Sequence, residues 1–141
     1  MPDPTQVVEQ NFIDAVKGNR LPRSTSSIDL SDSGLSGPQL VEIFESQVLS
    51  RHLDLRSRKL QAAGQGFYTI GSSGHEGTAA IAAAFRFDDM AFLHYRDAGF
   101  LIQRSKMLPA QTPIWDMLLS FVASSDDPIS GGRHKVLGSK S

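Results

Sequence analysis

The sequence has 141 residues, 40% of them hydrophobic and 21% charged, which is the range of one ordinary globular domain. Its formal net charge of −1 provides no general field for nucleic acid or an anionic membrane, so any anion site must be local. The absence of cysteine excludes disulfides and thiolate chemistry and agrees with a reducing compartment, and the four histidines are too scattered for a metal motif.

Residues 1–36 are predicted to be a flexible N-terminal arm. They contain one short apolar patch between Val7 and Val16, followed by a polar, Ser-rich tract. Such a tract cannot repay its ordering entropy by itself, so we expect at most one short helical stretch that docks on a partner. Acidic residues precede any apolar run, which is wrong for a secretory or transit leader, and no run is long enough to span a membrane. We therefore expect a cytoplasmic protein.

A long helix is predicted over residues 37–63. Ser36 and Gln39 have capping-box spacing, Pro38 suits the first turn, and Gly64 follows the expected end. Two apolar rows predict a wide buried stripe, formed by Val41, Phe44, Val48 and Leu55 and by Leu49, Leu53 and Leu60. Most of the basic side chains in the second half are expected in solvent, and these are Arg51, Arg56, Arg58 and Lys59.

A second capping box, formed by Ser73 and Glu76, predicts a helix over residues 77–85. Nearly every residue of this helix is small, which allows other backbones to approach closely. We therefore expect it to be sandwiched between other elements or subunits.

Residues 90–95 are predicted to form a buried strand that leads into a short helix over 97–104. The strand is apolar except for His94, and its alternation places His94 on the opposite face from Tyr95. A last helix is expected to start at Thr112, and the rest of the chain reads as loop. The expected core side of this helix carries Ile114, Trp115, Leu118, Leu119 and Val122.

The step from the strand to the helix delivers Tyr95 and Arg96 to a helix start, which is the architecture of an anion site. A helix start exposes unpaired N–H groups and the positive end of the dipole, and a guanidinium there adds a bidentate donor for phosphate or carboxylate. From the residues alone an alternative stays open, in which Arg96 pairs with a neighbouring acid and Tyr95 is half-buried in the core.

Three segments follow each other in a distinctive order, GFYTIGSSGHEG at 66–77, FLHYRDAG at 92–99 and DDPISGGRHK at 126–135. Together they resemble the N-terminal part of the alpha subunit of thiamine-diphosphate-dependent 2-oxo acid dehydrogenases, closest to the branched-chain type. The resemblance covers roughly Leu40 to the C-terminus. It implies an α/β fold class, with residues 37–141 as an incomplete, mostly helical portion of a thiamine-diphosphate-binding fold with one or two strands.

The resemblance also implies roles for two residue pairs. The family's Tyr-Arg pair contacts the cofactor's diphosphate, and it matches Tyr95 and Arg96. Arginine suits this role better than lysine because its donors have a fixed fork geometry. Phe67 and Tyr68 match the family's aromatic step at the substrate side of the cofactor, which implies a substrate pocket. Burial in the core is the alternative for Phe67.

Two further residues are possible members of the site. His75 stands where related subunits commonly carry Gln or Glu, and a structural histidine in a helix cap is the alternative. Arg133 belongs to a Gly-Arg loop that leads toward the cofactor site in the family, with a free tail as the alternative. The resemblance assigns no catalytic residue and no metal ligand to this chain.

The implied function is that of the decarboxylating dehydrogenase component, which uses thiamine diphosphate and Mg²⁺ to decarboxylate a branched-chain 2-oxo acid and to acylate a lipoyl domain. The expected partners are a beta subunit or fused beta domain and the lipoyl domain of the acyltransferase, in an oligomer without nucleic acid or membrane. Relatives hold Mg²⁺ through a later Gly-Asp-Gly segment that these 141 residues lack. We therefore expect a fragment that is inactive alone, with the metal ligands outside it.

Two other functions remain open from the sequence. One is a non-catalytic helical module for subunit interaction, built on the small-residue helix and the basic helix. The other is a stand-alone binder of phosphate esters that uses Arg96.

Limited proteolysis tests the predicted arm. Because residues 1–36 carry too few apolar groups to form a core, a protease of broad specificity is expected to cut between residues 20 and 30 before it cuts the helix over 41–63. Mass spectrometry of the early fragments gives the order of cleavage. Equal protection of the bonds at 24–27 and of that helix would contradict the prediction.

Overall fold

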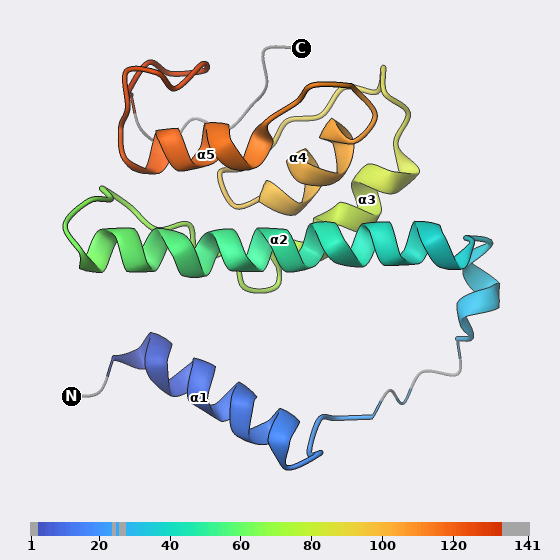
Figure 1. Cartoon of the computed structure of the whole chain (residues 1–141). Coiled ribbons are helices and arrows are strands. Elements are labelled where there is room, and N and C mark those ends of the chain that lie inside the picture. Colours follow the sequence, from blue (N-terminus) through green and yellow to red (C-terminus); the bar gives the residue numbers. More distant parts are fainter. Residues whose placement is uncertain (1–2, 24, 26–27, 134–141) are drawn as a thin grey trace. The chain divides into compact units, whose positions relative to one another are not determined.

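The computed structural model describes residues 3–23, 25 and 28–133, which form helices joined by loops (Figure 1). The chain divides into two compact units, Met1–Leu35 and Ser36–Ser141. None of the described helices is both long and apolar enough to cross a membrane.

The described residues of the first unit form the helix α1, Pro4–Lys17, and the 3-10 turn η1, Leu30–Ser33. Asp29 caps η1 by accepting the backbone N–H of Ser31 at 2.9 Å, and this bond, with one from the Ser31 hydroxyl, holds the pKa of Asp29 below its ordinary value. The apolar side chains of α1 are mostly exposed. The flexibility of this arm stays a prediction.

The second unit is built on the long helix α2, Gly37–Ala62. The 3-10 turn η2 (His75–Gly77) and the helices α3 (Thr78–Ala84), α4 (Ala98–Ser105) and α5 (Pro113–Phe121) all pack on α2 or its neighbours (Figure 1). The core cluster between these elements consists of Leu53, Tyr68, Ile70, Ala98, Leu101, Ile102, Met117 and Phe121.

The ends of α2 confirm the sequence prediction, and its buried face confirms it only in part. The backbone N–H of Ser36 donates to the side chain of Gln39 at 2.9 Å, and Gly64 follows the last turn with a left-handed φ of 70°. Val41 and Phe44, expected in the core, are 68% and 63% exposed. Leu53 is buried in the core as expected and Leu49 packs against it, but the rest of the buried face consists of Ile43, Ser46, Ser50, Asp54 and Ser57. Small serines allow the neighbouring helices to approach, so packing overrides hydrophobicity here.

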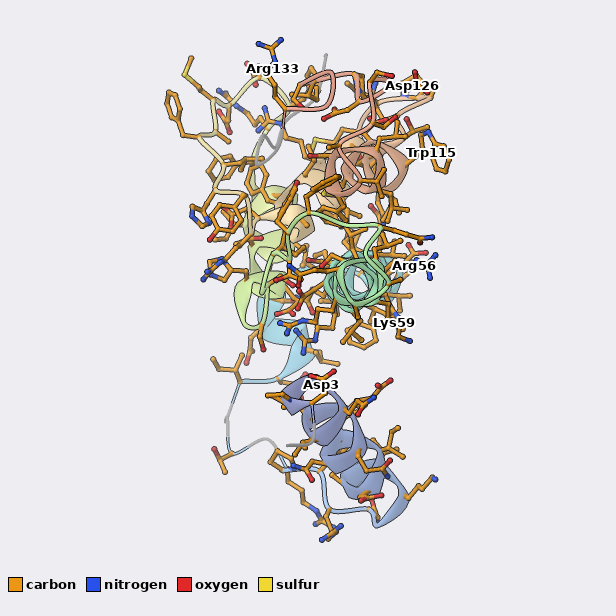
Figure 2. The ribbon with its side chains drawn as sticks, turned by 90° about the vertical axis from the view of Figure 1, so that its left-hand side faces the viewer. Asp3, Arg56, Lys59, Trp115, Asp126 and Arg133 are labelled. Carbon is orange, nitrogen blue, oxygen red and sulfur yellow. The ribbon has the colours of Figure 1, made fainter. Side chains whose placement is uncertain are left out.

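Asp54 is a fully buried carboxylate in the middle of α2. It lies 2.9 Å from Arg51 Nη1 and 3.4 Å from Arg58 Nε, and it accepts the backbone N–H of Gly71 at 3.0 Å. Two guanidinium groups and one N–H offset the cost of removing the charge from water. The carboxylate thereby fixes the loop after α2 to the helix. Arg56 and Lys59 remain exposed, as predicted, and project from the outside of α2 (Figure 2).

The strand expected at 90–95 is not formed, so the described residues do not confirm the α/β fold class. The described residues contain no β-strand, and within this segment Phe92 is 93% exposed. A strand is stable only when its backbone pairs with a neighbour, and the described part of the chain supplies none. The residues that precede this segment are fixed by Arg104, whose Nη2 donates to the carbonyls of Phe87 and Asp89 at 2.5 and 2.6 Å. The second unit is therefore helical.

The N-cap before this helical region lies one residue later than the predicted capping box places it. Gly74, rather than Ser73, is the N-cap of η2, and its backbone N–H donates to Glu76 Oε2 at 2.7 Å. The regular helix α3 begins only at Thr78. The left-handed φ of 90° at Gly74 explains the shift, because glycine adopts this conformation without steric cost.

Helix α4 confirms its prediction, and α5 starts where expected, with Ile114 and Leu118 packed against the core as predicted. Trp115, predicted on the core side, is 62% exposed and points away from the packed helices (Figure 2). Phe121 packs edge-on against Tyr68 with ring centroids 5.3 Å apart, and the Tyr68 hydroxyl lies 2.8 Å from Ser120 Oγ. These contacts fix the rotation of α5 and turn Trp115 outward.

Removing the Asp54 charge should destabilise the second unit strongly. Asp54→Asn leaves two partly buried guanidinium groups without their counter-charge, so we expect a loss of about 3 kcal/mol in the free energy of unfolding. The matched control is Glu45→Gln, which breaks the exposed 2.8 Å ion pair with Lys106 and should cost less than about 1 kcal/mol. Urea unfolding followed by circular dichroism measures both. Equal effects of the two variants would refute a scaffolding role for Asp54.

Candidate functional site

Five side chains gather before α4 and form what we call the α4 cluster, namely His75, His94, Tyr95, Arg96 and Asp97. The rings of His94 and Tyr95 have centroids 4.0 Å apart, and the His75 ring stacks on His94 at 6.3 Å. The guanidinium carbon of Arg96 lies 5.2 Å from the centroid of the Tyr95 ring, in a cation–π contact. The cluster thus places two imidazoles, one phenol and one guanidinium side by side.

Asp97 holds the cluster together with both carboxylate oxygens. Its Oδ1 lies 3.3 Å from His75 Nδ1, and its Oδ2 accepts the backbone N–H of His94 at 2.8 Å. The backbone N–H of Asp97 in turn donates to the carbonyl of His94 at 2.9 Å, which closes a turn. The prediction that His94 and Tyr95 point to opposite faces is wrong, because strand alternation does not apply to a turn.

Arg96 carries a donor without a partner. Its Nε is buried, and no hydrogen-bond acceptor for it lies in the part of the chain that the structure describes. Among those residues no carboxylate forms an ion pair with Arg96 either, so the alternative of a simple acid partner is not supported. A buried donor that stays unpaired costs about 1–3 kcal/mol. Such a cost is typical of a group that is kept ready for a ligand.

The turn η2 positions His75 from both sides. Glu76 accepts the N–H of Gly74 and lies 3.8 Å from Arg51 Nη1, which links η2 to α2. The hydroxyl of Thr78 donates to the His75 carbonyl at 2.8 Å and accepts the N–H of Phe100 at 3.2 Å, which links η2 to α4. The separation between His75 and Asp97 is therefore set by the packing of three elements.

Gly99 allows this close packing. A Cβ atom at position 99 would lie 3.0 Å from the Glu76 carbonyl oxygen and 3.5 Å from the Ala79 nitrogen. Any larger residue would push α4 away from η2 and α3, and the His75–Asp97 contact lies at this junction.

The other predicted site residues lie in different surroundings. Tyr68 is buried in the core cluster, against which Tyr95 also packs, while Phe67 is 71% exposed. Arg133 is exposed, and its Nε donates to the Ser130 carbonyl at 3.1 Å, at the end of the described chain (Figure 2). A substrate pocket at the aromatic step and a site role of Arg133 stay predictions. The remainder of the basic loop, at 134–135, lies outside the described residues.

Sequence reasoning selected Tyr95 and Arg96, which lie in this cluster, but it did not select Asp97 and it assigned His94 to packing. The signal that was available is the acid that follows the Tyr-Arg pair, since an acid three residues after His94 suits a turn that bonds back to the backbone. Within the described ranges no three His, Cys, Asp or Glu side chains gather as a metal site. The structure therefore assigns no metal ligand to this cluster.

Comparison with known proteins supports the resemblance to the alpha subunit of a 2-oxo acid dehydrogenase, in its N-terminal part. The chain is 30% identical over 103 residues to the 2-oxoisovalerate dehydrogenase subunit alpha of Bacillus subtilis (strain 168), a match that covers 71% of the chain. The chain spans 29% of the length of that curated relative. No family model matches the sequence, and no solved structure matches it.

Substitution of Gly99 tests the close packing beneath the site. Gly99→Ala forces a backbone shift between α4 and η2, and we expect a loss of about 1–3 kcal/mol in the free energy of unfolding, the scale of overpacking. Gly77→Ala is the matched control, because φ at this position is −58° and a Cβ there meets nothing within 4 Å. The control should stabilise the protein by about 0.4–1 kcal/mol instead of destabilising it. Thermal unfolding compares the two, and an unaffected Gly99→Ala protein would contradict the packing argument.

Proposed function

We propose that the α4 cluster binds the diphosphate end of thiamine diphosphate, with Arg96 as the principal donor, and that the chain serves as part of a 2-oxo acid dehydrogenase alpha subunit. The observation that carries this proposal is the buried, unpartnered Nε of Arg96 at the start of α4. The similarity to the 2-oxoisovalerate dehydrogenase subunit alpha supports the choice of cofactor.

The chemistry of the cluster fits a diphosphate. A guanidinium offers charge-assisted donors in a fixed plane, and the cation–π contact with Tyr95 keeps that plane oriented. The start of α4 adds the positive end of a helix dipole. The carboxylate of Asp97 opposes an anion at the same place, and its contact with His75 moderates this repulsion. The donors therefore outweigh the single acid.

Thiamine diphosphate supplies, when bound, the carbanion chemistry by which a 2-oxo acid loses carbon dioxide. The described residues of this chain hold and orient the anionic end of the cofactor. We further propose a branched-chain 2-oxo acid as the substrate, a lipoyl domain as the acyl acceptor, and a beta subunit or fused beta domain that contributes the Mg²⁺ site in an oligomer. These proposals rest on the name of the relative and on the sequence motifs.

In the proposed assembly the helices of this chain form part of a larger thiamine-diphosphate-binding α/β fold. The segment 90–95 then gains the backbone partner that the described residues lack, and the exposed side chain of Phe92 becomes covered. This proposal reconciles the apolar sequence of the segment with its irregular structure here.

A second function, a non-catalytic module for subunit interaction, is favoured by the exposed apolar side chains Val41, Phe44 and Trp115. The two functions differ in what they require of Arg96. A module that only binds another subunit has no use for a buried donor without a partner, whereas a cofactor site depends on it.

The Arg96→Ala variant tests the proposed function. In the assembled enzyme this change removes a charge-assisted donor pair, and we expect the binding of thiamine diphosphate to weaken by about 2–3 kcal/mol. Arg96→Lys should recover part of the lost affinity, because lysine restores the positive charge but not the paired, coplanar donors of the guanidinium. Isothermal titration calorimetry in the presence of Mg²⁺ measures the affinity.

The matched control is Arg86→Ala, because Arg86 is exposed and paired with Asp88 and Asp89. This variant should bind the cofactor like the unmodified protein. If Arg96→Ala leaves the affinity unchanged as well, Arg96 is not part of the site and the interaction module becomes the better explanation.

A further inference from the structure

His75 and Asp97 form a histidine–carboxylate pair that the binding of a diphosphate by Arg96 does not by itself require. The pair joins two segments far apart in the sequence, with His75 Nδ1 3.3 Å from Asp97 Oδ1. The second oxygen of Asp97 already accepts the backbone N–H of His94. Because a carboxylate only accepts hydrogen bonds, the Nδ1 of His75 must be the donor, and the proton that His75 gains or loses is carried by Nε2.

Asp97 and Arg96 belong to the same cluster: Asp97 contacts His75, the His75 ring stacks on His94, and the Tyr95 ring contacts both His94 and the Arg96 guanidinium. A carboxylate charge within this cluster opposes the binding of an anion at that guanidinium. A proton on His75 converts the pair into a neutral ion pair and removes most of the opposition. The His94 ring stacks on the His75 ring, so the two imidazoles lie together in the cluster.

We propose that His75 is a positioning residue for the anion site, whose protonated form neutralises Asp97 and thereby strengthens the binding of a diphosphate at Arg96. This inference rests on the proposed function of the α4 cluster. It makes anion binding proton-linked: the anion-bound protein favours the protonated imidazole, so binding takes up a proton. The affinity therefore rises as the pH falls through the range in which imidazoles titrate.

The charges around His75 leave Asp97 as its partner. On the same turn, Glu76 is engaged by the N–H of Gly74 and by Arg51 of α2. From α2, the buried Asp54 is occupied by its own guanidinium groups. The neighbouring α3 offers the hydroxyl of Thr78, which bears no charge.

The remaining ionisable neighbours belong to the segment that precedes α4. Tyr95 touches the ring of His94, and Arg96 lies over Tyr95.

The test compares the full 141-residue chain with its His75→Asn variant, using inorganic pyrophosphate as the ligand at pH 8 and pH 5.5. Asparagine keeps a donor toward Asp97 and cannot gain a proton. The ionisation of pyrophosphate is common to both proteins, so the ratio of their affinities isolates His75. We expect a ratio within about twofold at pH 8 and about fivefold to tenfold tighter binding by the unmodified protein at pH 5.5. Titrations followed by NMR suit weak binding.

Two further variants sharpen the result. Asp97→Asn removes the opposing charge, so it should bind pyrophosphate more tightly than the unmodified protein at pH 8 and should abolish the dependence on His75. A residue with a merely structural role would lower affinity at every pH instead. His52→Asn is the matched control, since His52 is an exposed histidine of α2 outside the cluster, and it should behave like the unmodified protein.

The outcomes separate this inference from the proposed function. A ratio that stays constant with pH, while Arg96→Ala still weakens binding, overturns the role of His75 and leaves the anion site intact. Pyrophosphate binding that is absent, or insensitive to Arg96→Ala, overturns both. Should His75→Asn fail to fold, the chemical-shift titration of the His75 ring in the unmodified protein decides. Its midpoint moves to higher pH with pyrophosphate if the inference holds and does not move if it is wrong.

Discussion

The buried carboxylate of Asp54 is the group on which the arrangement of the second unit depends. It accepts the backbone N–H of Gly71 and binds Arg51 and Arg58 from its own helix, so the loop after α2 must return to this point. Arg51 extends the network to Glu76, which lies 3.8 Å away. The buried charge of Asp54 thus fixes the start of η2, and η2 places His75 in contact with Asp97. The geometry of the proposed anion site therefore depends on the charge of Asp54, which is far from the site in the sequence.

The α4 cluster departs from the rule that buried polar groups find partners within the protein. The Nε of Arg96 is buried without an acceptor among the described residues, although a neighbouring acid, Asp97, stands next to it in the chain. Asp97 is occupied by His75 and by the His94 N–H, so the guanidinium is kept from pairing with it. The same contacts that organise the turn therefore leave Arg96 available for a ligand. This division of roles explains why an acid is tolerated within a site for an anion.

Local signals in the sequence predicted the ends of α2, the position of α4 and the placement of Tyr95 and Arg96 at a helix start. Capping spacing, glycine and proline act over a few residues, and the structure confirms them. The polar part of the buried face of α2 was missed because Ser46 and Asp54 become interior only through partners near residues 71 and 103. The strand at 90–95 was wrong because pairing needs a second strand. Trp115 turned outward because the Tyr68–Ser120 contact sets the rotation of α5.

The central claim is that the buried Nε of Arg96 is the donor for an anion, and the N–H resonance of that atom reports on it directly. In a ¹H–¹⁵N spectrum of the full chain recorded during addition of inorganic pyrophosphate, the Arg96 Nε–H signal should shift and exchange more slowly with solvent. The corresponding signal of Arg86, an exposed arginine paired with Asp88 and Asp89, should stay unchanged. An Arg96 signal that does not respond, or that moves no more than those of the exposed arginines, would contradict the claim.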